Sequence, residues 1–115
     1  MSCLFNSLSA FIPQDPFTVR QIICDYLQEN KPIIDGIDTR YILSLEHPCY
    51  IQHMRNPSTW GGAIEIQCAC RIWNIGIHVY NQRDKDGRKI EFIPTGEPER
   101  VIELYWTGGH YEPIR

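Results

Sequence analysis

The sequence has no long apolar run and no cluster of basic residues. No window approaches the roughly 18 apolar residues that a membrane-spanning helix needs, and the first residues lack the basic head and apolar stretch of a signal peptide. The formal net charge is −3, without a basic patch for nucleic acid. We therefore expect a cytoplasmic protein that binds neither a membrane nor nucleic acid.

The five cysteines lack the regular, even pattern of a disulfide framework. An odd number at irregular spacing is typical of free thiols in a reducing compartment, and we expect Cys24, Cys49, Cys68 and Cys70 to serve packing. Cys68 and Cys70 lie near His78, but a one-residue gap is not typical of zinc sites and no second ligand pair follows. We expect no metal and no cofactor.

Internal repeats and low-complexity segments are also lacking. At 115 residues, with 43% hydrophobic residues, the chain is predicted to form one folded domain over residues 1–115. We expect this domain to be a monomer.

Helix signals fill the first 73 residues. Ser2 can cap a helix that Pro13 stops, and Asp15-Pro16 is a start signal for a second helix. Ser58 or Thr59 is the candidate N-cap of a helix that begins near residue 60 and runs to residue 73. Shorter helices are predicted over residues 38–45 and 48–54.

The pattern then changes to alternation with a period of two. This predicts strands over residues 75–80, 90–93, 101–106 and 110–114, with a turn at Asp86-Gly87. Helices followed by strands indicate an α+β fold, in which the helices pack on a small, mainly antiparallel sheet.

Cys3 has the position of a candidate nucleophile. A lone cysteine on a helix is usually a small buried apolar residue. The first turn of a helix, however, carries unsatisfied N–H groups that stabilise a thiolate and can bind a developing oxyanion. Cys3 is therefore a candidate for the nucleophile and, through its N–H, for the oxyanion hole.

A histidine and a carboxylate lie close together near the other end of the chain. His110 follows a glycine pair that can present it at a sheet end, although a lone histidine is more often structural or merely exposed. Residues i and i+2 of a strand share a face, so Glu112 can lie beside His110 and hold its imidazole in the required tautomer. Tyr111 between them can pack beneath the imidazole ring.

Trp60-Gly61-Gly62 has two interpretations. It is either a turn in which the tryptophan covers the core, or a backbone that allows close approach in a narrow channel for a glycine-rich peptide.

Taken together, these segments resemble the ovarian tumour (OTU) family of cysteine proteases, most of whose members are deubiquitinases. The resemblance spans almost the whole chain and rests on Cys3-Leu4-Phe5 with Leu8, Tyr50-Ile51 with Met54, Pro57-Ser58-Thr59-Trp60-Gly61-Gly62, Ile64-Glu65-Ile66 with Ala69, Ile77-His78-Val79-Tyr80 and Gly109-His110-Tyr111.

The resemblance implies a papain-like nucleophile helix packed on a sheet, with Cys3 as the nucleophile and His110 as the general base. It also implies that Trp60, Gly61, Gly62 and Tyr111 line the channel for the Gly-Gly terminus of ubiquitin.

Two positions depart from the family pattern. The family usually has Asp or Asn where this chain has Glu112. It also usually has an Asp-Gly-Asn loop before the cysteine that helps to form the oxyanion hole, whereas Met1 and Ser2 stand before Cys3 here. Either Ser2, Cys3 and the helix amides build the hole, or needed residues are missing from the start.

The expected function is a minimal OTU-type deubiquitinase that cleaves ubiquitin or a ubiquitin-like modifier from lysine. The alternative is a catalytically weak or inactive ubiquitin-binding module of the same fold, and a third interpretation is an interaction domain with an inert Cys3. The compact size and short start suit a virus-encoded or bacterial-effector member that acts in a host cytoplasm.

Overall fold

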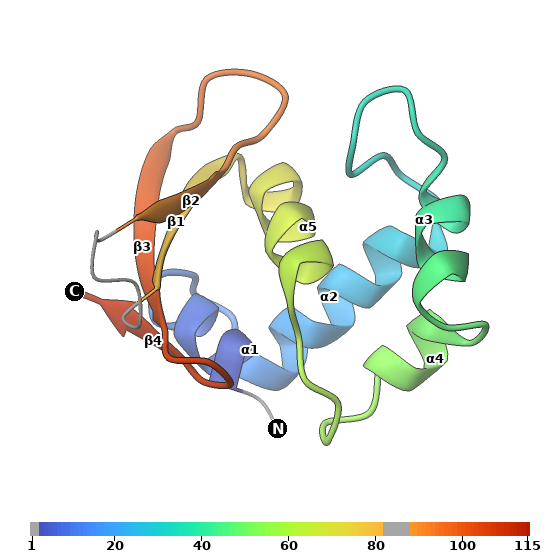
Figure 1. Cartoon of the computed structure of the whole chain (residues 1–115), viewed down its shortest axis with the longest axis horizontal. Coiled ribbons are helices and arrows are strands. Elements are labelled where there is room, and N and C mark those ends of the chain that lie inside the picture. Colours follow the sequence, from blue (N-terminus) through green and yellow to red (C-terminus); the bar gives the residue numbers. More distant parts are fainter. Residues whose placement is uncertain (1–2, 82–87) are drawn as a thin grey trace.

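The computed structural model describes residues 3–81 and 88–115 (Figure 1). The expected Ser2 cap and the Asp86-Gly87 turn lie outside these residues. The described chain forms, in order, α1 (Cys3–Ser9), α2 (Pro16–Gln28), α3 (Thr39–Glu46), α4 (Tyr50–Met54), α5 (Ala63–Trp73), β1 (Ile75–Asn81), β2 (Lys89–Phe92), β3 (Arg100–Trp106) and β4 (Tyr111–Ile114). Within the described ranges, no helix is both long and apolar enough to cross a membrane.

The four strands form one mixed sheet in the order β2-β1-β3-β4. β1 pairs with β2, and β3 with β4, in antiparallel fashion, whereas the central pair β1 and β3 is parallel. Ile77 of β1 lies opposite Ile102 of β3, and both are buried. The α+β architecture is therefore confirmed, with two of the three strand pairs antiparallel.

The longest described helix, α2, begins where its sequence predicts. The Asp15 side chain accepts a hydrogen bond from the N–H of Thr18 at 2.8 Å, and Pro16 occupies the first helical position. Val19, Ile23 and Leu27 are fully buried at helical spacing.

The helices cover one face of the sheet, with α5 between the sheet and α2 (Figure 1). α1 contacts both α2 and the edge strand β4, while α3 and α4 lie on the side away from the sheet. This arrangement brings the first helix of the chain beside its last strand. The core is formed mainly by α1, α2, α5 and the inner face of β1 and β3.

A buried arginine links three segments of the helical layer. The Arg20 guanidinium, in α2, lies 4.1 Å from the centre of the Phe5 ring and donates hydrogen bonds to the carbonyls of Met54 at 2.8 Å and Pro57 at 3.2 Å. Because Arg20 is 1% exposed, these contacts satisfy a group that would be costly to bury alone. Arg20 therefore fixes the chain that leaves α4 against α1 and α2.

Candidate active site

Cys3 is the first residue of α1, and its side chain is partly exposed. The helix is anchored because Leu4, Phe5 and Leu8 are each at most 1% exposed. The Ser7 hydroxyl donates a hydrogen bond to the Cys3 carbonyl at 2.9 Å. The first N–H groups of a helix have no acceptor within it, so Cys3 combines an accessible thiol with backbone donors on a fixed support.

His110 follows a two-glycine turn and directly precedes β4. Gly108 and Gly109 have φ values of 90° and 157°, which favour glycine. His110 Nε2 lies 3.4 Å from Glu112 Oε1, and both side chains are 56% exposed. The prediction that His110 begins the last strand is wrong by one residue, since β4 begins at Tyr111. The Thr107 N–H donates to the His110 carbonyl at 3.0 Å and closes the turn, and the His110 and Glu112 side chains still lie side by side.

Tyr111 connects the two ends of the chain. β4 runs beside α1 (Figure 1). The Tyr111 side chain is half-buried and packs against the core. Burial raises the pKa of Tyr111, and the negative charges that Cys3 and Glu65 can carry raise this pKa further. Tyr111 therefore lies on the strand that contacts α1, the helix that begins with Cys3, and it directly follows His110 in sequence.

Trp60 and Gly61 lie between α1 and the turn before His110. A Cβ added to Gly61 would stand 2.8 Å from Leu4 Cδ2 and 3.0 Å from the Phe5 ring. A Cβ added to Gly109 would stand 3.5 Å from the Trp60 ring. Trp60 is 52% exposed, so it does not cover the core. The close backbone approach is thus at Gly61, against the first turn of the candidate nucleophile helix.

The cap of α5 differs from the expected one. Gly62, and neither Ser58 nor Thr59, is the N-cap residue. The Thr59 hydroxyl donates instead to the His53 carbonyl at 2.7 Å, and the Gly62 N–H is bound by the Glu65 carboxyl at 2.7 Å. Glu65, at the third helical position, accepts from the N–H of the N-cap residue, which is the half of a capping box that does not need an N-cap side chain.

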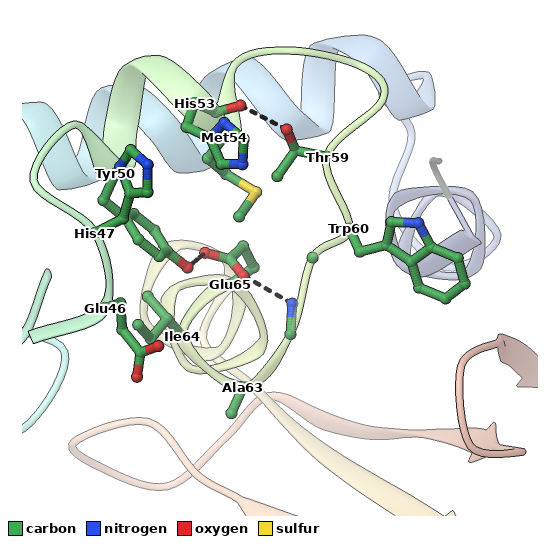
Figure 2. A pocket seen from close by; sticks show the side chains of 12 residues that line it. Glu46, His47, Tyr50, His53, Met54, Thr59, Trp60, Ala63, Ile64 and Glu65 are labelled. Atoms are coloured by element: carbon green, nitrogen blue, oxygen red, sulfur yellow. Dashed lines mark hydrogen bonds between the residues drawn. The ribbon is translucent and has the colours of Figure 1, made fainter.

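Two pockets adjoin this segment. One, of about 520 Å³, opens between α4 and the start of α5 and is lined by Tyr50, His53, Trp60 and Glu65 among others (Figure 2). None of the three catalytic candidates is among its described lining residues. The other, of about 220 Å³, is mainly apolar and is lined by Ala63, Ile66, Val79, Asn81, Ile90, Phe92, Trp106 and Tyr111. The apolar pocket therefore shares Tyr111 with the candidate channel.

Comparison with known proteins identifies the family. Residues 2–111 match the family described as OTU-like cysteine protease. The chain belongs to this OTU family.

Two curated relatives are similar to this OTU domain. The ovarian tumor domain-containing deubiquitinating enzyme 4 of Arabidopsis thaliana is 30% identical over 83 residues, 67% of this chain and 26% of the relative. The putative ubiquitin thioesterase otu1 of Schizosaccharomyces pombe is 25% identical over 111 residues, 96% of this chain and 32% of the relative. The chain therefore spans about a quarter of the length of the first relative and about a third of the length of the second.

Solved structures confirm the fold. An OTU domain in complex with ubiquitin has a TM-score of 0.75 at 24% identity, covering 97% of this chain and 62% of that one. The viral OTU domain protease from Dera Ghazi Khan virus has a TM-score of 0.74 at 20% identity, covering 99% and 74%. An OTU deubiquitinase from Wolbachia pipientis wMel, bound to ubiquitin, has a TM-score of 0.66 at 17% identity, covering 99% and 89%.

The remaining cysteines of this OTU domain divide into two kinds. Cys24, Cys68 and Cys70 are buried, as expected for packing residues, whereas Cys49 is exposed at the N-cap of α4, so the packing prediction is wrong there. Among the described residues, no group of three or more His, Cys, Asp or Glu could hold a metal ion. The Ser2 half of the expected oxyanion hole lies outside the described residues.

Sequence reasoning assigned no role to Arg20, Tyr50 or Glu65, whose buried hydrogen bonds hold the segment between α4 and α5. The three-residue spacing from Gly62 to Glu65 is that of a capping box and could have indicated Glu65. Arg20 follows Val19 on the buried side of α2, but a charged residue in that stripe is ordinarily predicted to be exposed.

Proposed function

We propose that this OTU domain is a deubiquitinase, a thiol isopeptidase that hydrolyses the bond between the C-terminal glycine of ubiquitin, or of a ubiquitin-like modifier, and a lysine. The names of two curated relatives support this reaction. Two structural neighbours were crystallised with ubiquitin, which supports the same partner.

In the proposed first half-reaction, His110 takes the proton of the Cys3 thiol, and the thiolate attacks the carbonyl carbon of the terminal glycine. The new C–S bond forms a tetrahedral oxyanion, which the first backbone N–H groups of α1 face. The C–N bond then breaks as His110 gives its proton to the lysine amine.

In the second half-reaction, water attacks the thioester carbonyl while His110 takes one of its protons. The C–S bond breaks, and the released carboxylic acid of ubiquitin gives its remaining proton to solvent. The proton on His110 balances the Cys3 thiolate. Glu112 orients the imidazole and stabilises its cationic form, since their side chains are 3.4 Å apart.

The placement of Trp60 and Gly61 is the observation that carries this proposal. The Gly61 backbone packs on the first turn of α1, and the Trp60 ring lies beside the turn that presents His110. Gly61 has no room for a side chain against the buried Leu4 and Phe5, so its backbone lies close against the helix that carries Cys3. In the proposed complex, the Gly-Gly terminus of the substrate lies along this backbone. The adjoining apolar pocket, which contains Tyr111, would take an apolar side chain of the segment before the two glycines.

A ubiquitin derivative with a cysteine-reactive electrophile at its C-terminus tests the proposal in one gel. Covalent capture at Cys3 supports the enzyme. Reversible retention without capture supports the ubiquitin-binding module, and the absence of both supports an interaction domain with an inert thiol.

A further inference from the structure

Glu65 is a buried carboxyl that receives two hydrogen bonds from different elements. It is 1% exposed, at the first turn of α5. The Tyr50 hydroxyl, from α4, donates to Oε2 at 2.5 Å, and the Gly62 N–H donates to Oε1 at 2.7 Å (Figure 2). A buried carboxyl without such partners would be strongly destabilising, so its two contacts define its position.

The Gly62 contact places Glu65 at the end of the candidate channel wall. Gly62 follows Gly61, whose backbone leaves less than a methyl group of clearance against Leu4. The Trp60 side chain points away from Tyr50 and Glu65 (Figure 2). Tyr50 and Glu65 therefore lie on the opposite side of the Trp60–Gly62 backbone from the Trp60 side chain. Any shift of Gly62 toward the pocket would move Gly61 relative to α1.

The other end of the same segment is held by Arg20. Its guanidinium binds the carbonyls of Met54 and Pro57 and lies over the Phe5 ring. Opposite charge also attracts Arg20 and Glu65. Residues 55–62 are therefore anchored at both ends by buried polar side chains, and the Arg20 anchor also contacts Phe5 of α1.

We propose that Glu65 and Tyr50 are positioning residues for the reaction. They hold the Gly61-Gly62 backbone at the separation from Cys3 that a Gly-Gly terminus requires, without contact to the substrate. The inference rests on the proposed deubiquitinase function. It predicts a defect in substrate binding with a thiol of unchanged reactivity.

The main test is Tyr50→Phe. Every protein in the test also carries Cys49→Ser, so that Cys3 is the one thiol accessible to the reagents. Tyr50→Phe removes one anchor of Glu65 and leaves the ring in place. Tyr26→Phe is the matched control, because the Tyr26 hydroxyl also donates a short hydrogen bond, to the Pro32 carbonyl at 2.5 Å. Tyr26 lies near the C-terminal end of α2. Two rates are measured: capture by the ubiquitin electrophile and alkylation of Cys3 by iodoacetamide.

We expect Tyr50→Phe to slow capture by the ubiquitin electrophile about ten-fold, which corresponds to a free-energy change of about 1.4 kcal/mol. The rate of Cys3 alkylation should not change. In hydrolysis, KM should rise while kcat stays near that of the background protein. Tyr26→Phe should change neither rate. Equal capture by the Tyr50→Phe and background proteins would overturn the proposal, and so would a parallel fall of capture and alkylation.

Glu65 provides the second pair of variants. Glu65→Gln keeps an oxygen for the Gly62 N–H and should retain most of the capture rate, whereas Glu65→Ala should lose it. Equal losses in both would overturn the positioning role.

Hydrogen exchange at the Gly62 amide separates this inference from the proposed function. Tyr50→Phe should accelerate this exchange, and Tyr26→Phe should not. If the background protein is not captured at all, the proposed function fails, while the exchange result still decides whether Tyr50 holds the segment. Unchanged exchange at Gly62 in Tyr50→Phe would contradict the inference.

Discussion

The backbone of Gly61 lies against the side chain of Leu4, the residue after Cys3. A Cβ at Gly61 would stand 2.8 Å from Leu4 Cδ2, closer than real contacts of this kind. Leu4 is 1% exposed and belongs to the core. One contact therefore links the stability of the fold to the shape of the candidate channel.

Gly61→Ala is expected to impair both properties. Overpacking of this kind costs about 1–3 kcal/mol, and a small displacement of a substrate-positioning segment can slow a reaction by up to about 100-fold. Capture by the ubiquitin electrophile and chemical denaturation measure the two effects. Gly96→Ala is the matched control, since a Cβ there meets no atom within 4 Å. Normal capture by a folded Gly61→Ala protein would show that the glycine pair is only a turn.

The five cysteines should react as two classes. Cys3 and Cys49 are accessible, whereas burial raises the pKa of Cys24 to about 11 and that of Cys70 to about 12. Burial also raises the pKa of Cys68. We expect iodoacetamide at neutral pH to label Cys3 and Cys49 in the native protein and all five in the unfolded one. Peptide mass mapping checks this, and rapid native labelling of Cys68 would contradict the packing.

Glu112 is expected to orient His110 and not to transfer a proton. Glu112→Ala should lower kcat/KM by about 10–100-fold, as for the loss of a hydrogen bond to a charged group, and less than His110→Ala does. Glu112→Gln should fall between Glu112→Ala and wild type, because its amide oxygen still accepts the imidazole N–H. Glu112→Asp, measured in the same assay, shows whether a shorter carboxylate also fits. An unchanged rate and pH profile in Glu112→Ala would leave a Cys3–His110 dyad.

The stability of the protein should report the burial of Glu65. Burial raises its pKa above 4.5, despite hydrogen bonds from Tyr50 and Gly62 that lower it. The folded protein then binds this proton more tightly than the unfolded one, so the contribution of Glu65 is largest below its unfolded pKa and is lost as pH rises through the folded pKa. The unfolding free energy of wild type relative to Glu65→Gln should therefore fall as the pH rises above the ordinary pKa of a glutamate, about 4.3. A difference that grows over this range would show that the hydrogen bonds outweigh burial.

Local signals predicted much of the fold. Asp15 and Pro16 start α2 through their own chemistry, and the alternation of apolar residues from Ile75 places β1. The proximity of His110 and Glu112 likewise follows from their spacing of two.

Contacts between distant segments could not be predicted in this way. The parallel pairing of β1 with β3 depends on which strands become neighbours in the sheet, and the periodicity of a single strand does not encode this. The N-cap at Gly62 depends on the burial of Glu65, and the place of Arg20 depends on carbonyls more than 30 residues away. Cys49 was expected in the core because cysteine is usually buried, but α4 is too short to bury it.

Hydrolysis of ubiquitin joined to a lysine peptide by an isopeptide bond tests the central claim most directly. The assay compares the wild-type protein with Cys3→Ser and Cys49→Ser, because Cys49 is the other accessible thiol. We expect wild type and Cys49→Ser to release the peptide at equal rates, and Cys3→Ser to release it at least about 1,000-fold more slowly, since a hydroxyl is a far weaker nucleophile. Release by Cys3→Ser at the wild-type rate, or no release by the folded wild-type protein, would contradict a thiol isopeptidase built on Cys3.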